Sequence, residues 1–389
     1  MREFKIFCVV AVFTALVYWG VEPFAHSVMS PHLAPANFDF EAEDLSYAKS
    51  VVETRQNELN LAQNELSKAT DKAAAQSKVK VAENALNSAK ANLEANTALW
   101  ARVKQIDFKS GNAAQGKEFF AAGGGMCSGC HGIKADGLAA PITDSAAGVT
   151  PPDLSLIGAF YDEKFLAALI LNPALALKID HKFPDGSFSV MLPYNADLSG
   201  DSEDVVSANI ANLVAYFKEI AANHQKSVNS SLTSELQAKY AKLEGASEAE
   251  KAEFIAKDLA FENDKLVFVE TCGRCHDMKY DKFTATSAKN DLKTYLGSIP
   301  PDLSMYIRSR TTEYLNNFIN NTQKALSGTA MPRVGLTEAA QKSVISYMEK
   351  VGDSKKDERQ SLGLWIMGFF AFLSIFAILW KRKIWSELH

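Results

Sequence analysis

Cysteine is scarce in this sequence, with five among 389 residues. So few cysteines exclude a disulfide-rich secreted scaffold. Basic residues are not in excess either, because 41 Lys and Arg stand against 46 Asp and Glu and the formal net charge is -5. This balance argues against a dedicated nucleic-acid binder, so we expect no nucleic-acid partner. Hydrophobic residues make up 47% of the chain, which excludes a fully disordered protein.

Residues 41–110 contain no glycine, proline, cysteine or histidine. They are rich in residue types that are compatible with a helix. Apolar residues repeat there every seven positions in two phases, and the phase changes around 70–78. We predict a helical hairpin or coiled coil with its turn near Thr70–Gln76, acting as a spacer or as a docking arm. The two series are Leu45, Val52, Leu59, Leu66 and Ala73, and then Val79, Leu86, Leu93 and Trp100.

Charge is absent from an apolar run near each end of the chain. As a helix, Leu362–Trp380 would span about 28 Å, close to the hydrocarbon thickness of a bilayer. Three basic residues open the tail 381–389, so the positive-inside rule places this tail in the cytoplasm. Residues 1–24 are a retained anchor or a cleaved signal peptide, and the longer than usual apolar run favours the anchor. Either interpretation places the middle of the chain outside the cytoplasm, with lipid around its ends.

Four of the five cysteines lie in two Cys-x-x-Cys-His motifs, and the fifth, Cys8, lies in the N-terminal apolar run. This motif is the attachment signature of c-type haem: the cysteines form thioethers and the histidine binds the iron. A zinc site would leave the histidines unexplained, and structural disulfides across a two-residue loop are strained. A thioredoxin-like site needs no following histidine. We therefore predict two covalently bound haem c groups, at Cys127, Cys130 and His131 and at Cys272, Cys275 and His276.

The surroundings of the two motifs are also repeated. Pro151–Ser155 recurs as Pro300–Ser304, and each is followed by a methionine in a loop. The repeated prolines form a rigid turn, supply a carbonyl acceptor for the Nδ1 hydrogen of the histidine, or do both. We predict an all-α protein with two like domains, 111–224 and 258–352, joined by a linker with a helical part over 225–257. Each domain is expected to hold an amphipathic helix, over 203–220 and 337–351.

The sixth iron ligand separates electron transfer from catalysis, because methionine and histidine together close both axial positions. In the second domain we expect Met331, since Met278 is too close to His276, Met348 belongs to a helix core and Met305 is the weaker choice. In the first domain we expect Met191. Its rival is His181, in a segment that the second domain lacks.

These motifs resemble class I cytochrome c domains in tandem, as in di-haem cytochromes of the c4 type. With the C-terminal anchor the layout is similar to cytochrome c1 subunits of the quinol:cytochrome c reductase (cytochrome bc1) complex, in the di-haem form of epsilonproteobacteria. The resemblance implies a bacterial inner-membrane protein with periplasmic haem domains. It implies a membrane cytochrome b and a Rieske iron–sulfur protein as partners, and a periplasmic cytochrome c or oxidase as electron acceptor.

The chain by itself would then be an electron carrier, and the complex the respiratory quinol:cytochrome c oxidoreductase. The apolar N-terminal segment and residues 41–110 depart from the mono-haem c1 pattern. Two alternatives are a di-haem subunit of a cbb3-type oxidase, whose anchor precedes the haem domains, and a di-haem peroxidase, which needs an exchangeable axial position.

Overall fold

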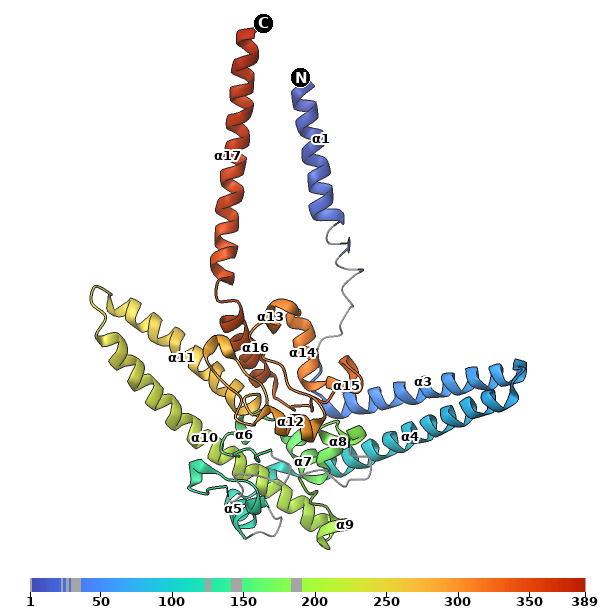
Figure 1. The fold of residues 1–389 in the computed structure, drawn as a ribbon. Helices are drawn as coiled ribbons and strands as arrows, with labels where there is room; N and C mark the ends of the chain where they lie inside the picture. The colour runs from blue at the N-terminus through green and yellow to red at the C-terminus, as the bar shows by residue number, and fades with distance from the viewer. Residues whose placement is uncertain are drawn as a thin grey trace.

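The computed structural model describes residues 2–21, 24–25, 28, 36–122, 127–140, 149–182 and 191–388. Over these ranges the chain forms helices and no β-strand, as expected of an all-α protein. A central body carries two long helical hairpins, and the two terminal helices leave it side by side (Figure 1).

The first hairpin is formed by α3 (Phe40–Lys68) and α4 (Lys72–Lys104), with the turn at Ala69–Asp71, close to the position expected from the change of heptad phase. An aspartate side chain caps each helix, Asp39 on α3 and Asp71 on α4. The two apolar series face each other within one chain, so no second molecule is needed to cover them. Their buried contacts are Leu59, Val79 and Leu86.

The second hairpin contains the predicted linker over 225–257 and extends its expected helical part. This segment is helical: α10 (Glu203–Ala241) continues far beyond its amphipathic part, and α11 (Glu248–Thr271) leads into the second motif. Gly245 turns the chain with φ 82°, and Ser247 opens α11 with a reciprocal capping box. The helical part expected in this polar stretch therefore fills it on both sides of a short turn over 242–247, and the stretch contains no proline.

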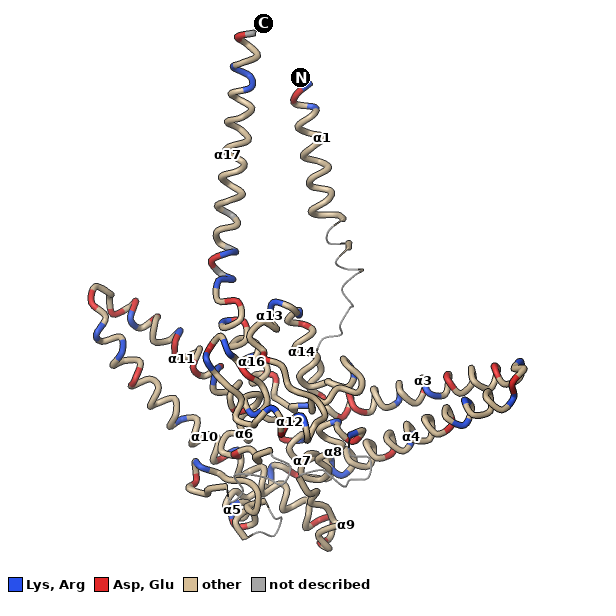
Figure 2. The backbone as a smooth tube through the Cα atoms, in the orientation of Figure 1, with Lys and Arg blue, Asp and Glu red and all other residues tan. Residues whose placement is uncertain are grey.

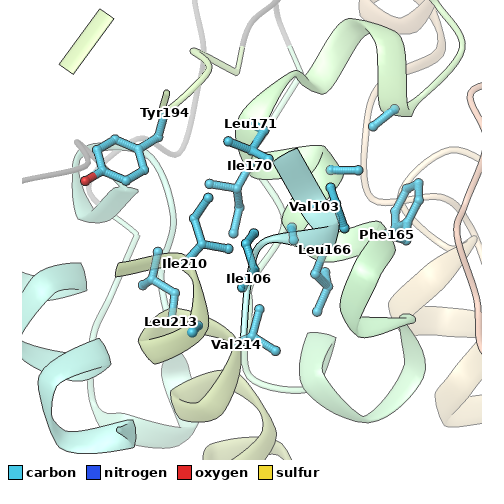
Figure 3. Close-up of a cluster of buried hydrophobic side chains, with 14 of the residues drawn as sticks. Val103, Ile106, Phe165, Leu166, Ile170, Leu171, Tyr194, Ile210, Leu213 and Val214 are labelled. Carbon is cyan, nitrogen blue, oxygen red and sulfur yellow. The ribbon is translucent and has the colours of Figure 1, made fainter. Parts of the chain in front are cut away.

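The first hydrophobic core lies around α5 (Ala113–Ala121), α7 (Glu163–Leu171) and α10. Val103 of α4 and the following Ile106 lie among the side chains of α7 and α10 (Figure 3). The base of the first hairpin is therefore part of this core. Shorter elements complete this half: η2 (Phe108–Ser110), α8 (Pro173–Ala176), η5 (Asp180–Lys182) and α9 (Ala196–Ser199).

The second core lies around α11, α14 (Thr312–Asn320) and α16 (Glu338–Gly352). Two side chains of the first half, Leu156 and Phe160, are buried in it. The shorter elements here are η6 (Lys279–Asp281), α12 (Lys289–Leu296), α13 (Tyr306–Ser309) and α15 (Thr322–Ala325), with α6 (Ile157–Phe160) entering from the first half.

The two halves share backbone hydrogen bonds along one short antiparallel contact. Thr337 N donates to Phe160 O at 2.9 Å, and Asp162 N donates to Gly335 O at 3.0 Å. Gly335 has φ 77°, and a Cβ at this position would lie 2.1 Å from the ring of Phe165. Only glycine fits this place, so the close approach of the two halves is encoded in the sequence.

The terminal helices are α1 (Arg2–Leu16), which continues as a π-helical turn over Val17–Val21, and α17 (Lys356–Leu388). Arg2–Val21 and Ser361–Glu387 are each long and apolar enough to cross a membrane. In α17 the charged residues lie at the two ends of a long uncharged stretch (Figure 2). Lys381 Nζ lies 2.5 Å from Glu3 Oε2, so the far ends of the two helices are in contact.

We predict that Val79→Ala loosens the first hairpin and that Val81→Ala does not. Val79 is 8% exposed in the contact between the helices, whereas Val81 is 66% exposed. Removing two buried carbons costs on the order of 1–2 kcal/mol. Native-state hydrogen exchange of the α3 and α4 amides measures the change. Equal protection in the two variants would contradict the observed packing.

Candidate functional site

The first Cys-x-x-Cys-His motif forms a tight turn at the end of α5. Cys127 opens the short helix η3 (Cys127–Gly129), and its carbonyl accepts hydrogen bonds from Cys130 N at 3.1 Å and His131 N at 2.8 Å. These bonds fold the segment Cys127–His131, which carries both thiols and the imidazole, into a single turn. Residues 123–126, 141–148 and 183–190 lie outside the described part of the chain.

The imidazole of His131 is held by the carbonyl that the repeated prolines were expected to supply. His131 Nδ1 lies 2.9 Å from Pro152 O. A carbonyl can only accept a hydrogen bond, so Nδ1 carries the hydrogen and Nε2 keeps its lone pair. Burial also lowers the pKa of His131, which favours the neutral ring, the form of imidazole that can bind a metal.

The second motif repeats this geometry at the end of α11. Cys272 O accepts from Cys275 N and His276 N, both at 3.0 Å. His276 Nδ1 lies 2.8 Å from Pro301 O, and burial lowers the pKa of His276. The two imidazoles are thus held in the same tautomer by equivalent carbonyls.

The proline segments are held in place by an aspartate and a serine that sequence reasoning had noted only as part of the repeat. Asp153 accepts Lys134 N at 3.1 Å in the first half, and Asp302 accepts Lys279 N at 3.3 Å in the second. The serine of each segment accepts a second backbone N–H, Ser155 from Ala135 at 3.0 Å and Ser304 from Tyr280 at 3.1 Å. These bonds tie the proline segment to the residues just after the histidine.

A further repeated contact, which sequence reasoning missed, joins each motif to the last helix of its half. Tyr216 of α10 donates to Asp136 at 2.6 Å, and Tyr347 of α16 donates to Asp281 at 2.7 Å. A lysine also pairs with each aspartate, at 2.8 Å and 2.7 Å. Asp136 and Asp281 are offset by the same number of residues as the cysteines, and this was the available signal.

The two halves differ at the residue after the histidine, which is Gly132 in the first and Asp277 in the second. Gly132 O accepts Leu154 N at 2.9 Å, and Asp277 O accepts Leu303 N at 3.0 Å, so the backbone tie is preserved. The Asp277 side chain accepts the N–H of Ala285 at 2.9 Å. It also pairs with Lys289 Nζ at 2.5 Å, so the second turn has side-chain bonds that Gly132 cannot make.

Burial raises the pKa of the Cys127 and Cys272 thiols to about 11. No disulfide joins the cysteines of the described ranges. Within these ranges no three His, Cys, Asp or Glu side chains are grouped to hold a metal ion, so the zinc alternative has no ligand set there. Two thiols and an imidazole whose Nε2 keeps its lone pair match the groups that hold a c-type haem, because the haem already contains its iron.

The methionines fall into three environments. Met278 and Met348 are buried in the second core, and Met305 is exposed, with its sulfur accepting the Tyr280 hydroxyl at 2.8 Å. Met331 is half-buried in the loop between α15 and α16, and Met191 is half-buried against the first core. His181 is exposed in η5. The assignment of Met331 and Met191 as iron ligands, with His181 as the alternative to Met191, stays a prediction.

Comparison with known proteins identifies one domain. The cytochrome c family model matches residues 113–221, which include the first motif and the expected ligand Met191. No curated protein and no solved structure gives a significant match. The chain therefore contains a cytochrome c domain, for which covalent haem c and electron transfer are the family's properties.

We predict that Gly132→Ala destabilises the first motif by about 1–3 kcal/mol, the usual cost of overpacking. Gly132 directly follows His131, and a Cβ on it would lie 2.5 Å from the backbone nitrogen of Ala140. Gly129→Ala is the matched control, because a Cβ there has nothing within 4 Å. Thermal unfolding and the yield of haem on the first motif measure the effect. Equal losses of stability and of bound haem in the two variants would contradict the close packing around Gly132.

Proposed function

Starting from the cytochrome c domain, we propose that this chain is a membrane-anchored electron carrier with two covalently bound haem c groups. One haem would be held by Cys127, Cys130 and His131. The other would be held by Cys272, Cys275 and His276.

The observation that carries the proposal is the hydrogen bond from each histidine to its proline carbonyl, repeated at 2.9 Å and 2.8 Å. An imidazole that donates through Nδ1 presents Nε2 as a ligand with fixed orientation. The second half lies outside the matched domain, yet it keeps the aspartate, serine and tyrosine contacts of the first. Conservation of this whole set within one chain supports a second cytochrome c domain over 258–352.

The residues of the chain would act as follows. The thiols of Cys127, Cys130, Cys272 and Cys275 would hold the haem groups covalently, as thioethers at their vinyl groups. The bound haem supplies a reversible one-electron step at its iron. His131 and Met191 would hold the iron at the first motif, and His276 and Met331 would hold it at the second. With these side chains as ligands, each site would exchange electrons without binding a substrate.

The terminal helices support an anchor with two spans. α1 and α17 both extend from the same side of the central body, with the two chain termini at their far ends (Figure 1), and basic residues follow the apolar stretch of α17. The contact of Glu3 with Lys381 favours an N-terminal helix that is retained beside the C-terminal one. The positive-inside rule then places the haem domains on the periplasmic side of a bacterial inner membrane.

Within the electron-transfer class we propose the cytochrome c1 role in a quinol:cytochrome c reductase. The support is the resemblance of the layout, with paired haem motifs on one side of a membrane and an anchor after them. The partners would be a membrane cytochrome b and a Rieske protein, with a periplasmic cytochrome c or an oxidase as acceptor.

We predict that the double variant Cys272→Ala/Cys275→Ala retains one covalent haem and that the wild type carries two. The mirror variant, Cys127→Ala/Cys130→Ala, should also retain one, because each motif has its own thiols. Intact-protein mass and the pyridine haemochrome assay count the haems. A single haem in the wild type would contradict the di-haem proposal.

We also predict that the tagged chain, purified from its membrane in mild detergent, brings a cytochrome b and a Rieske protein with it. Quinol should then reduce both haems, because the chain lies downstream of the iron–sulfur cluster. Capture of an oxidase catalytic subunit, or of the chain alone, would contradict the reductase role and leave the electron-carrier class intact.

A further inference from the structure

A buried charge cluster connects the first hairpin with both halves of the central body. Its centre is Asp44 of α3, which is 1% exposed. The carboxylate lies 2.5 Å from Arg333 Nη2 and 2.9 Å from Lys178 Nζ, and it accepts the indole N–H of Trp100 at 2.9 Å. Lys178 belongs to the first half, Arg333 to the second and Trp100 to α4, so one side chain bonds three separate parts of the fold.

Arg333 is held on several sides, and it lies two residues after Met331. Its Nε donates to Asn320 O at 2.7 Å, and its guanidinium lies 5.3 Å from the centre of the Phe40 ring. Its backbone N–H donates to Leu177 O at 2.9 Å. With 3% exposure it has little freedom to move. The backbone just after Met331 is therefore fixed at Arg333.

The chain that approaches Met331 is also in contact with α3. Tyr47 donates to Gln323 O at 3.3 Å, and Glu43 pairs with Lys324 at 3.0 Å. The Gln323 side chain spans the following turn, because it accepts Gly328 N at 2.9 Å and donates to Thr329 O at 2.8 Å. Glu43, Asp44 and Tyr47 lie on the first turns of one helix, so α3 contacts the chain both before and after Met331.

From this arrangement we infer that the first hairpin is a clamp for the Met331 loop, and that Asp44 is the positioning residue that keeps Met331 on the iron of the second haem. The inference rests on the proposed function, because it takes Met331 as an axial ligand. It gives residues 41–110 a role within their own chain, beyond that of a spacer or a docking arm.

The charge on Asp44 is essential to such a clamp. Burial acts to raise the pKa of this carboxyl, but Arg333 and Lys178 lower it below the usual value, so the group stays ionised. Asp44→Asn keeps the size of the side chain and removes the charge. The variant leaves two buried cations without their counter-ion, and Arg333 then loses its strongest link to α3.

The test uses the full chain in detergent, with both haems attached, and titrates the ferric protein with imidazole. In the wild type, imidazole must displace a methionine from the iron. We expect Asp44→Asn to bind imidazole at one haem at about tenfold lower concentration, which corresponds to ~1.4 kcal/mol. The sulfur-to-iron charge-transfer band of that haem should weaken in parallel. Tyr47→Phe should give a smaller change in the same direction, and its milder effect guards against misfolding.

Two further variants separate the possible failures. Met331→Ala identifies the second haem, and Glu65→Gln, at the exposed tip of the hairpin, should match the wild type. If Met331→Ala opens a haem but Asp44→Asn binds imidazole like the wild type, the clamp is overturned even where the melting temperature falls. If Met331→Ala leaves both haems unchanged, the ligand assignment in the proposed function is wrong, and the clamp fails with it. An equal change at both haems would also overturn the assignment to Met331.

Discussion

Asp44 has almost no contact with solvent, yet it stays ionised because two cations and an indole N–H surround it. Removing one member of such a buried group is costly, since the others lose a partner that water cannot replace. The group therefore holds the first hairpin, the first half and the second half in one arrangement. Asn96 extends it by accepting from Lys178 at 2.8 Å. The rest of the fold depends on this contact, because it is made where all three parts meet.

Each motif depends in turn on a smaller constraint, the bond between an imidazole and a proline carbonyl. The aspartate and serine after the prolines leave that carbonyl little freedom, and a tyrosine from the last helix of each half holds the other side of the motif. The hydrogen bond from Nδ1 orients each imidazole, and the bonds around its acceptor keep that acceptor in place. The surrounding set of hydrogen bonds converts the motif, which is a local sequence feature, into a site of fixed geometry.

Much of this could be predicted from the sequence, because the signals are local or periodic. The heptads located the hairpin, the repeat located both motifs, and the doubled prolines indicated an acceptor for Nδ1. The linker over 225–257 was expected to be helical only in part, whereas its helix propensity makes it helical on both sides of the turn at Gly245. The contact of Asp44 with Arg333 could not be predicted, since it joins residues far apart in the chain and depends on tertiary packing. An aspartate in a helix rich in charged residues carries no mark that distinguishes it from those in solvent.

The contact between the halves has a consequence for electron transfer. The chain carries its two motifs on halves that share backbone hydrogen bonds at Phe160–Asp162 and bury each other's side chains, as Leu156 and Phe160 show. Two domains on a flexible linker would sample many separations, and transfer between them would wait for a favourable one. Here α10 and α11 form a second hairpin, and the short contact at Gly335 also joins the halves. The connection is long in sequence, but packed backbone sets the geometry between the motifs; with a haem on each motif, as proposed, this arrangement would give an electron one fixed path between them.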